Sequence, residues 1–366
     1  MIVPISPLPY AISMNFCFLP NMTQKGAIGI HSARAGRKFH LLNLANTNQF
    51  CYNCAKFWKQ MQIKGIAMQI TQKLKNSLKN FGELVVFKHT IFSSTFLLVA
   101  VTVAFTQIAS TINAGFIAKT LILCALALIF ARNFAMAFNR FCDTKFDAIN
   151  PRTSSRPSVD GRISSNALLG FTIANALGFI ATSFFINTLA FALSLPFLLI
   201  IGVYSYFKRF SALAHFVLGI SLALAPIAGV VAVMGAIPLW SVFLSLGVAF
   251  WVAGFDLLYS LQDIEFDKAN GLFSIPSVYG LKATIFISRF AHIMAVIFWA
   301  LFAWDSGGGI FAYLGVVSAF AMLIYEHYLV AKDLLNIPKA FFQTNGYLGV
   351  VFLVFILLDC TFKGLL

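Results

Sequence analysis

Residues 213–258, LAHFVLGISLALAPIAGVVAVMGAIPLWSVFLSLGVAFWVAGFDLL, hold one acidic residue, Asp256, and no Lys or Arg. Each of the two apolar runs, 213–235 and 238–258, is long enough for a helix to cross the roughly 30 Å hydrocarbon core of a bilayer. A short break from Gly235 to Pro238 separates the runs, which is typical of a tight turn between antiparallel helices. The stretch therefore predicts a helical hairpin inside a membrane.

The rest of the chain repeats this pattern of long apolar runs and short polar breaks. Of the 366 residues, 60% are hydrophobic and only 10% are charged, whereas about a quarter are charged in a soluble domain. The runs do not alternate every second residue, which excludes a transmembrane barrel. We predict an all-α integral membrane protein with about nine transmembrane helices. They fall at 91–109, 115–138, 165–187, 189–206, 213–235, 238–258, 282–303, 308–330 and 346–363.

Positive charge is unevenly distributed along the chain. The formal net charge is +14, and residues 1–82 hold ten Lys and Arg residues with no Asp or Glu. Further basic residues occur in the long connections 139–164, 207–212 and 331–345, whereas the connections on the other side are short and nearly uncharged. The positive-inside rule places the long connections in the cytoplasm or its topological equivalent. We attribute the excess charge to topology and anionic lipid, and expect no nucleic-acid partner.

Two matched pairs of aspartates follow the second and the sixth predicted helices. Each pair has the spacing i, i+4 and a polar residue one turn earlier, so a continuing helix would present all three side chains on one face. The recurrence after about 120 residues indicates two pseudo-repeated halves of four helices each. The two motifs read Asn139-x3-Asp143-x3-Asp147 and Tyr259-x3-Asp263-x3-Asp267.

The aspartate pairs require a compensating cation, because like charges at this spacing destabilise a helix and are costly at membrane depth. Carboxylate and amide oxygens without nearby His or Cys suit a hard ion such as Mg²⁺, which shares its coordination shell with water and phosphate oxygens. Basic residues predicted on the same membrane face would neutralise phosphate charge. They are Lys145, Arg152, Arg156, Lys208 and Arg209. The pattern predicts a Mg²⁺-dependent diphosphate site.

At these residues the sequence resembles the UbiA family of membrane prenyltransferases, over about 88–366. The segment Lys88-His89-Thr90-Ile91-Phe92 is similar to the opening of the bacterial branch of 4-hydroxybenzoate polyprenyltransferases. The other matching segments are Ala131-Arg132, NRFCDTKFD at 139–147, NPRTSSRP at 150–157, Gly161, YSYFKRF at 204–210, GFDLLYSLQDIEFD at 254–267 and GLFSIP at 271–276.

The resemblance implies a UbiA-like bundle that binds a polyprenyl diphosphate through Mg²⁺ on the two Asp motifs. The diphosphate ionises to an allylic cation, an aromatic ring attacks it, and metal with Lys and Arg stabilises the charge on the departing pyrophosphate. Asp143, Asp147, Asp263 and Asp267 are then catalytic, and they bind the metal together with Asn139. The residues expected to bind substrate are Asn139, Arg132, Lys88, Arg156, Lys208, Arg209 and Tyr259.

The acceptor and the function class leave alternatives open. An aromatic acid needs a cationic partner, for which Lys88, Arg132 and Arg156 are candidates. The first interpretation is 4-hydroxybenzoate, in ubiquinone biosynthesis, and the alternative is an aromatic precursor of the futalosine route to menaquinone. Outside the family, a membrane transporter also has intramembrane carboxylates and repeated halves, although here the carboxylates cluster at helix ends and not at the midplane. A non-catalytic structural protein would not need paired Asp motifs with interleaved Arg.

Residues 1–67 show neither a spanning run nor the order of regions typical of a signal peptide. We interpret them as an extension that is disordered or precedes the true start, because Met68 begins a Lys-rich amphipathic lead into the first span. The prenyltransferase domain would then be 68–366. We expect a multi-pass protein of a bacterial inner membrane with its site on the cytoplasmic side. The acid-free, basic beginning leaves a mitochondrial inner membrane as the alternative.

Overall fold

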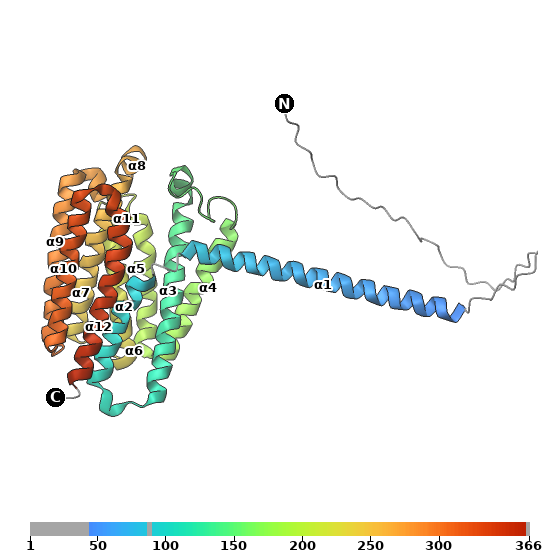
Figure 1. Ribbon diagram of the computed structural model, residues 1–366, viewed down its shortest axis with the longest axis horizontal. Helices are drawn as coiled ribbons and strands as arrows, with labels where there is room; N and C mark the ends of the chain where they lie inside the picture. The colour runs from blue at the N-terminus through green and yellow to red at the C-terminus, as the bar shows by residue number, and fades with distance from the viewer. Residues whose placement is uncertain (1–43, 86–89, 364–366) are drawn as a thin grey trace, which may run out of the picture. The chain divides into compact units, whose positions relative to one another are not determined.

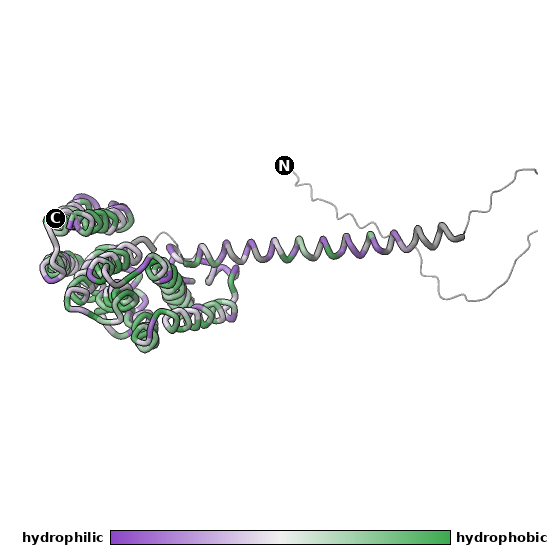
Figure 2. Tube along the Cα trace, turned by 90° about the horizontal axis from the view of Figure 1, so that it is seen from below, coloured by the Kyte–Doolittle hydropathy of each residue, from purple (hydrophilic) through white to green (hydrophobic). Residues whose placement is uncertain are grey.

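The structure is a computed structural model that describes residues 44–85 and 90–363 and contains no strand among them. Its contacts divide the chain into two compact units, Met1–Ala67 and Met68–Leu366. The first described helix, α1 (Leu44–Val85), runs across that boundary and mixes polar and apolar residues along its length (Figure 2). Residues 1–43, most of the predicted extension, lie outside the described residues.

Membrane-length helices form the bundle of the second unit (Figure 1). Within the described residues, eight helices are long and apolar enough to cross a bilayer, and α2 (Thr90–Gln107) adds a shorter apolar helix. Each predicted span overlaps one of these nine helices, which confirms the predicted fold class. The eight begin and end as follows: α3 (Ala114–Ile149), α4 (Ser165–Ile186), α5 (Thr188–Phe207), α6 (Ala214–Met234), α7 (Leu239–Tyr259), α9 (Ile275–Asp305), α10 (Ile310–Lys332) and α12 (Asn345–Lys363).

Tight turns join consecutive helices at one end of the bundle. Asn187 ends α4 and caps α5, because its side-chain oxygen accepts a hydrogen bond from the Ala190 N–H at 2.8 Å. Its side-chain nitrogen donates to the Val231 carbonyl at 2.7 Å and so ties this turn to α6. Gly235 ends α6 in the left-handed region, with φ of 64°, which glycine adopts without steric cost. These turns make α4 and α5, and α6 and α7, antiparallel neighbours.

Aromatic side chains dominate the core between α2, α7, α9 and α12. The side chains of Trp251, Trp299, Phe96 and Phe352 are fully buried. The ring centroid of Phe96 lies 5.0, 5.2 and 5.5 Å from those of Trp251, Trp299 and Phe352. The ring centroid of Trp299 lies 6.0 Å from that of Trp251 and 5.3 Å from that of Phe352. The indole of Trp299 lies so close to Gly247 that a Cβ there would come within 2.3 Å of it. This packing joins α2 to α7, α9 and α12 and fixes α7, the helix that leads into the second Asp motif.

Longer connections lie at the opposite end of the bundle. With 36 residues at about 1.5 Å each, α3 is about 54 Å long and extends well past a hydrocarbon core of roughly 30 Å. The ends of α3 and α8 lie at this same end, which therefore carries both Asp motifs (Figure 1). The short elements here are η3 (Ser260–Asp263) and α8 (Ile264–Ala269) after α7, and η4 (Leu334–Asn336), α11 (Ile337–Lys339) and the π-helical turn η5 (Ala340–Thr344) before α12.

Candidate active site

A polar cavity of about 320 Å³ lies at the end of the bundle that carries the Asp motifs. Its walls come from α3, α5, α6, α7, α8 and η5 and from the connections that follow α3, α5, α7 and α8. Every residue predicted to bind substrate or metal that the structure describes lines this cavity, whereas Lys88 lies outside the described residues. Lys145, predicted to neutralise phosphate charge, does not line it. The lining residues predicted from the sequence are Arg132, Asn139, Asp143, Asp147, Arg156, Lys208, Arg209, Tyr259, Asp263 and Asp267.

The first Asp motif lies on a continuous helix, as predicted, because α3 extends to Ile149. Asn139 donates a hydrogen bond to Asp143 at 3.0 Å, which orients that carboxylate toward the cavity. Asp147 is buried, and one of its oxygens accepts a bond from Arg156 at 2.6 Å. Its other oxygen, Oδ2, has no hydrogen-bond partner among the described residues. A buried carboxylate oxygen in this state is a free ligand position beside the cavity.

The second Asp motif departs from the predicted continuous helix. The α-helix ends at Tyr259, and a 3₁₀ turn leads to Asp263, which has a φ of −107° and is the N-cap of α8. The hydroxyl of Ser260 donates to the Leu257 carbonyl at 2.8 Å, a local bond that competes with the continuing helix. Asp263 and Asp267 nevertheless face the same cavity. The i, i+4 spacing thus predicted the location of this pair correctly but not its backbone.

Packing against the next helix positions Asp267. This carboxylate is 2% exposed and accepts a hydrogen bond from the Ser274 hydroxyl at 2.7 Å. Ser274 is also the N-cap of α9 and forms a capping box with Ser277. The second motif is therefore connected directly to the start of α9.

Two arginines of the connection after α3 divide between the motifs. Arg156 pairs with Asp147, whereas Arg152 reaches across the cavity and binds Asp263 with two hydrogen bonds of 2.7 and 3.3 Å. Burial alone would lower the pKa of Arg152, but the carboxylate of Asp263 outweighs it and raises the pKa above its ordinary value. Arg152 also donates to the Tyr259 hydroxyl at 3.3 Å. One loop therefore supplies positive charge to both halves of the site.

Arg209, two residues after the end of α5, contacts the first motif. It lies 3.5 Å from an oxygen of Asp143, donates to the Cys142 carbonyl at 2.7 Å, and stacks with its guanidinium 4.8 Å from the ring centroid of Tyr206. The neighbouring Lys208 carbonyl accepts a bond from the backbone of Phe273 at 2.7 Å, which joins this connection to the one after α8.

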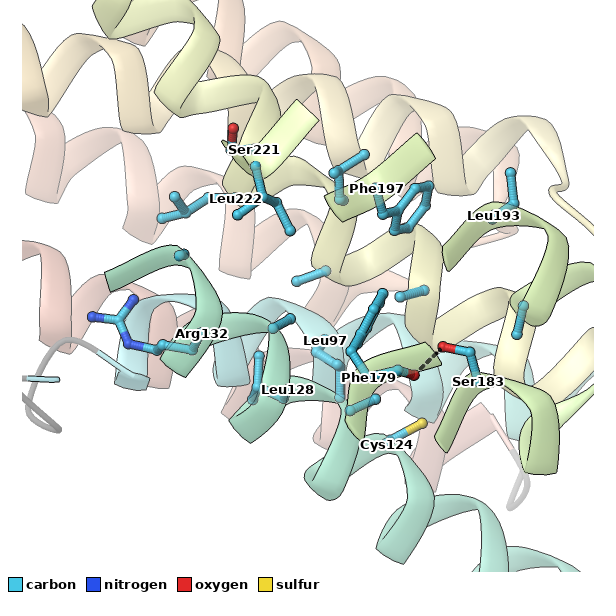
Figure 3. Close-up of a pocket in the computed structure, with 18 of the residues that line it drawn as sticks. Leu97, Cys124, Leu128, Arg132, Phe179, Ser183, Leu193, Phe197, Ser221 and Leu222 are labelled. Atoms are coloured by element: carbon cyan, nitrogen blue, oxygen red, sulfur yellow. Dashed lines mark hydrogen bonds between the residues drawn. The ribbon is translucent and has the colours of Figure 1, made fainter. Parts of the chain in front are cut away.

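An apolar pocket of about 140 Å³ shares part of its wall with the polar cavity. Figure 3 shows Arg132 at one end of this pocket and Ser183 with Leu193 toward the other. The Ser183 hydroxyl donates to the Phe179 carbonyl at 2.8 Å, so the far end presents little free polarity. The residues common to both spaces are Arg132, Met136, Tyr204, Leu218 and Leu222. A ligand with a charged head and an apolar tail fits this pair of spaces.

Comparison with known proteins identifies the family. The sequence profile of the UbiA prenyltransferase family matches residues 94–356. The chain belongs to the UbiA family. It is a prenyltransferase, and this assignment removes the transporter and structural alternatives.

Individual relatives and solved structures agree with the UbiA assignment. The 4-hydroxybenzoate octaprenyltransferase of Herminiimonas arsenicoxydans is 29% identical over 64% of this chain and 82% of the relative. The protein of the same name from Tolumonas auensis is 26% identical over 68% and 87%. A UbiA homologue from Aeropyrum pernix K1 superimposes with a TM-score of 0.67 at 29% identity, covering 75% of this chain and 98% of that one. A homologue from Archaeoglobus fulgidus bound to DMAPP and Mg²⁺ has a TM-score of 0.62 at 21% identity, over 77% and 99%, and shows a common fold.

The oxygen ligands of this UbiA site fit a metal ion whose coordination is completed by ligands from outside the protein, such as water or phosphate oxygens. Within the described part of the chain, no group of three or more His, Cys, Asp or Glu residues lies close enough to hold a metal ion by itself. The four motif aspartates nevertheless line one cavity, and Asp147 Oδ2 is free to coordinate. Hard oxygen ligands in this number suit a divalent cation that also binds phosphate oxygens.

Two further residues, Arg140 and Asp256, line the UbiA cavity. Arg140 donates to the Asn139 side chain at 3.2 Å, although a position next to Asn139 lies about 100° round the helix and outside an i, i+4 pattern. From the sequence, Asp256 could either support the site or form a hydrogen bond between helices. In the structure it lines the cavity and lies 2.7 Å from the Nδ1 of His215, a fully buried residue of α6. Lys145 is exposed and does not line the cavity.

Proposed function

We propose that this enzyme transfers a polyprenyl group from a polyprenyl diphosphate to 4-hydroxybenzoate in a Mg²⁺-dependent reaction. The observation that carries the proposal is the junction of a cavity lined by two Asp motifs with an apolar pocket, since a prenyl diphosphate has this same division of polarity. Relatives named 4-hydroxybenzoate octaprenyltransferase support the acceptor. The homologue bound to DMAPP and Mg²⁺ supports the donor and the metal.

The diphosphate would bind at the polar end of the site. Asp143, Asp147, Asp263 and Asp267, with Asn139, would hold Mg²⁺, which when bound neutralises charge on the pyrophosphate as it leaves. The guanidinium and ammonium groups around the cavity would donate hydrogen bonds to the remaining phosphate oxygens. They belong to Arg152, Arg156, Lys208 and Arg209. These interactions strengthen as negative charge develops on the leaving group, so they favour the transition state over the ground state.

The apolar pocket would hold the prenyl chain and keep water from the reacting carbon. When the bond between the prenyl carbon and the diphosphate oxygen breaks, the pyrophosphate takes the electron pair and an allylic cation remains. The aromatic ring then forms the new carbon–carbon bond and loses a ring proton. Exclusion of water by the apolar walls favours attack by the ring over hydrolysis.

Arg132 is the residue best placed to bind the acceptor carboxylate. It lies where the polar cavity meets the apolar pocket, and its Nε is buried without a hydrogen-bond partner among the described residues. An intramembrane arginine is costly, and a carboxylate ligand would satisfy this donor. Arg156 already pairs with Asp147, which favours Arg132 for this role.

We place the enzyme in a bacterial inner membrane with the cavity on the cytoplasmic side. The Arg-rich connection after α3 and the Lys208–Arg209 pair lie at the cavity end, and basic connections are retained in the cytoplasm. We propose further that residues 68–366 form the prenyltransferase domain and that residues 1–67 are dispensable for catalysis. A chain that starts at Met68 should insert and prenylate as the full chain does.

The test is an assay of membranes that contain this chain, with a polyprenyl diphosphate and Mg²⁺, against a panel of aromatic acids. Mass spectrometry should find prenylated 4-hydroxybenzoate, and EDTA should abolish its formation. A product formed only with a different aromatic acid, including one of the futalosine route, would replace the proposed acceptor. The absence of both prenylated product and released pyrophosphate with every acid would reject the proposed reaction.

A further inference from the structure

A buried polar cluster lies between α7, α10 and α12, away from the Asp motifs. At its centre Asn345 accepts a hydrogen bond from the Trp251 indole at 2.7 Å and donates to Glu326 at 2.9 Å. All three side chains are at most 1% exposed. The second oxygen of Glu326, Oε2, has no hydrogen-bond partner among the described residues. A carboxyl group is expensive to bury in a membrane helix, so its presence calls for a functional explanation.

The cluster lies next to a break in helical geometry. Asn345 is the first residue of α12, directly after the π-helical turn Ala340–Thr344. Its side chain also donates to the Ala340 carbonyl at 3.3 Å, at the start of that turn. Single π turns are rare overall, and those that occur are frequently found at functional sites. The hydrogen bonds of Asn345 therefore hold this turn against α7 and α10.

The π turn leads back to the active site through Phe341. This residue lines the polar cavity, and its ring centroid lies 4.2 Å from that of Tyr259 and 5.1 Å from that of Phe255. The hydroxyl of Tyr259 accepts a hydrogen bond from Arg152, which in turn binds Asp263. A continuous series of contacts thus runs from Asn345 to an aspartate of the second motif.

We propose that Asn345 is a positioning residue that fixes the π turn so that Phe341 supports Tyr259, and thereby orients Arg152 and Asp263 toward the diphosphate. The proposal rests on the diphosphate site described above. Glu326 acts in it as a hydrogen-bond acceptor for Asn345, and a neutral acceptor of the same shape should serve equally well. The first motif does not depend on this series of contacts, since α3 itself carries both of its aspartates.

The first experiment compares Asn345→Ala with Ser288→Ala in purified full-length protein. Ser288 is a matched control, because it is also fully buried and donates to the α7 backbone at Gly254, at 2.7 Å, but does not line the cavity. Asn345→Ala should raise the KM for prenyl diphosphate and the half-saturating Mg²⁺ concentration about 10-fold or more, with the KM for 4-hydroxybenzoate unchanged. Ser288→Ala should leave all three values unchanged. Equal KM values for prenyl diphosphate in wild type and Asn345→Ala would overturn the proposal.

The second experiment tests whether the effect passes through Phe341. If it does, Phe341→Ala should reproduce the Asn345→Ala phenotype, and the double variant should be no worse than the worse single variant. Multiplied losses would show independent roles and reject the proposal. If Asn345→Ala fails to fold, Glu326→Gln and Glu326→Leu give the same test. The Gln variant should keep the wild-type KM for prenyl diphosphate, and the Leu variant should have a raised KM. A raised KM in both variants, or in neither, would contradict the role of Asn345. A wild-type protein without turnover would instead refute the proposed function.

Discussion

The two Asp motifs have the same spacing and line the same cavity, but they are built differently. The first lies on one uninterrupted helix, α3, and Asn139 on that helix orients Asp143. The second crosses from α7 through a 3₁₀ turn into α8, and its Asp267 depends on Ser274 at the start of α9. Helical geometry therefore places both aspartates of the first motif on one face of α3, where Arg209 and Arg156 contact them. In the second motif, the backbone changes direction between the two aspartates, and a contact with α9 positions Asp267.

The largest effect is expected from removing one carboxylate charge in either motif. Asp143→Asn and Asp263→Asn should each lower kcat at least about 100-fold. Each removes a proposed ligand of the Mg²⁺ ion, whose charge balances that of the leaving pyrophosphate. Turnover in membranes with equal amounts of inserted protein provides the measurement. If one variant retains near-normal turnover, the two motifs do not share the metal, and the comparison between them fails.

Smaller losses should follow from removing the basic residues around the diphosphate. Arg156→Ala and Lys208→Ala should raise the KM for prenyl diphosphate about 10-fold to 100-fold, because a hydrogen bond to a charged group contributes about 1.5–3 kcal/mol. The KM for the acceptor should change far less, and initial rates over both substrate concentrations separate the two constants. A change confined to the acceptor would reverse the proposed roles of these residues and of Arg132.

Ser274→Ala sharpens the comparison, because it should affect the second motif alone. Loss of the bond to Asp267 should raise the half-saturating Mg²⁺ concentration about 10-fold. Ser164→Ala is the control: Ser164 caps α4 by accepting from the Ala167 N–H, and it does not line the cavity. In both variants the free energy of unfolding should fall by about 1 kcal/mol, because the helix loses its N-cap. If the half-saturating Mg²⁺ concentration changes by a similar factor in both variants, the change comes from lower helix stability and not from the lost contact with Asp267.

The smallest effect is expected at an exposed ion pair outside both motifs. Glu83 accepts hydrogen bonds from Arg162, which lower its pKa below the ordinary value of 4.5. Because the pKa falls on folding, the pair stabilises the protein above pH 4.5, and this contribution disappears as the pH falls through the lowered pKa. A Glu83→Gln variant should have wild-type kcat and a slightly lower Tm at pH 7, and the Tm difference should vanish in acid. A difference that grows in acid would contradict the assignment.

Several features of this protein follow from the sequence because they depend on local composition and spacing. Apolar runs predict the membrane helices, since the cost of placing a residue in lipid depends mainly on its own side chain. The i, i+4 spacing of Asp143 and Asp147 places them on one face of α3, because a helix returns to the same face after about one turn. The family resemblance implies that the four aspartates form one site. In the structure all four line one cavity.

Only the tertiary structure decides which charges meet across the cavity. Arg152 and Asp263 are 111 positions apart, and their contact depends on the packing of α3 against the second half of the bundle. The same holds for His215 with Asp256 and for Asn345 with Glu326, which lie on different helices. No periodicity along a single helix encodes such pairs, because each depends on the rotation and height of two helices relative to each other. Packing of whole side-chain surfaces sets both quantities.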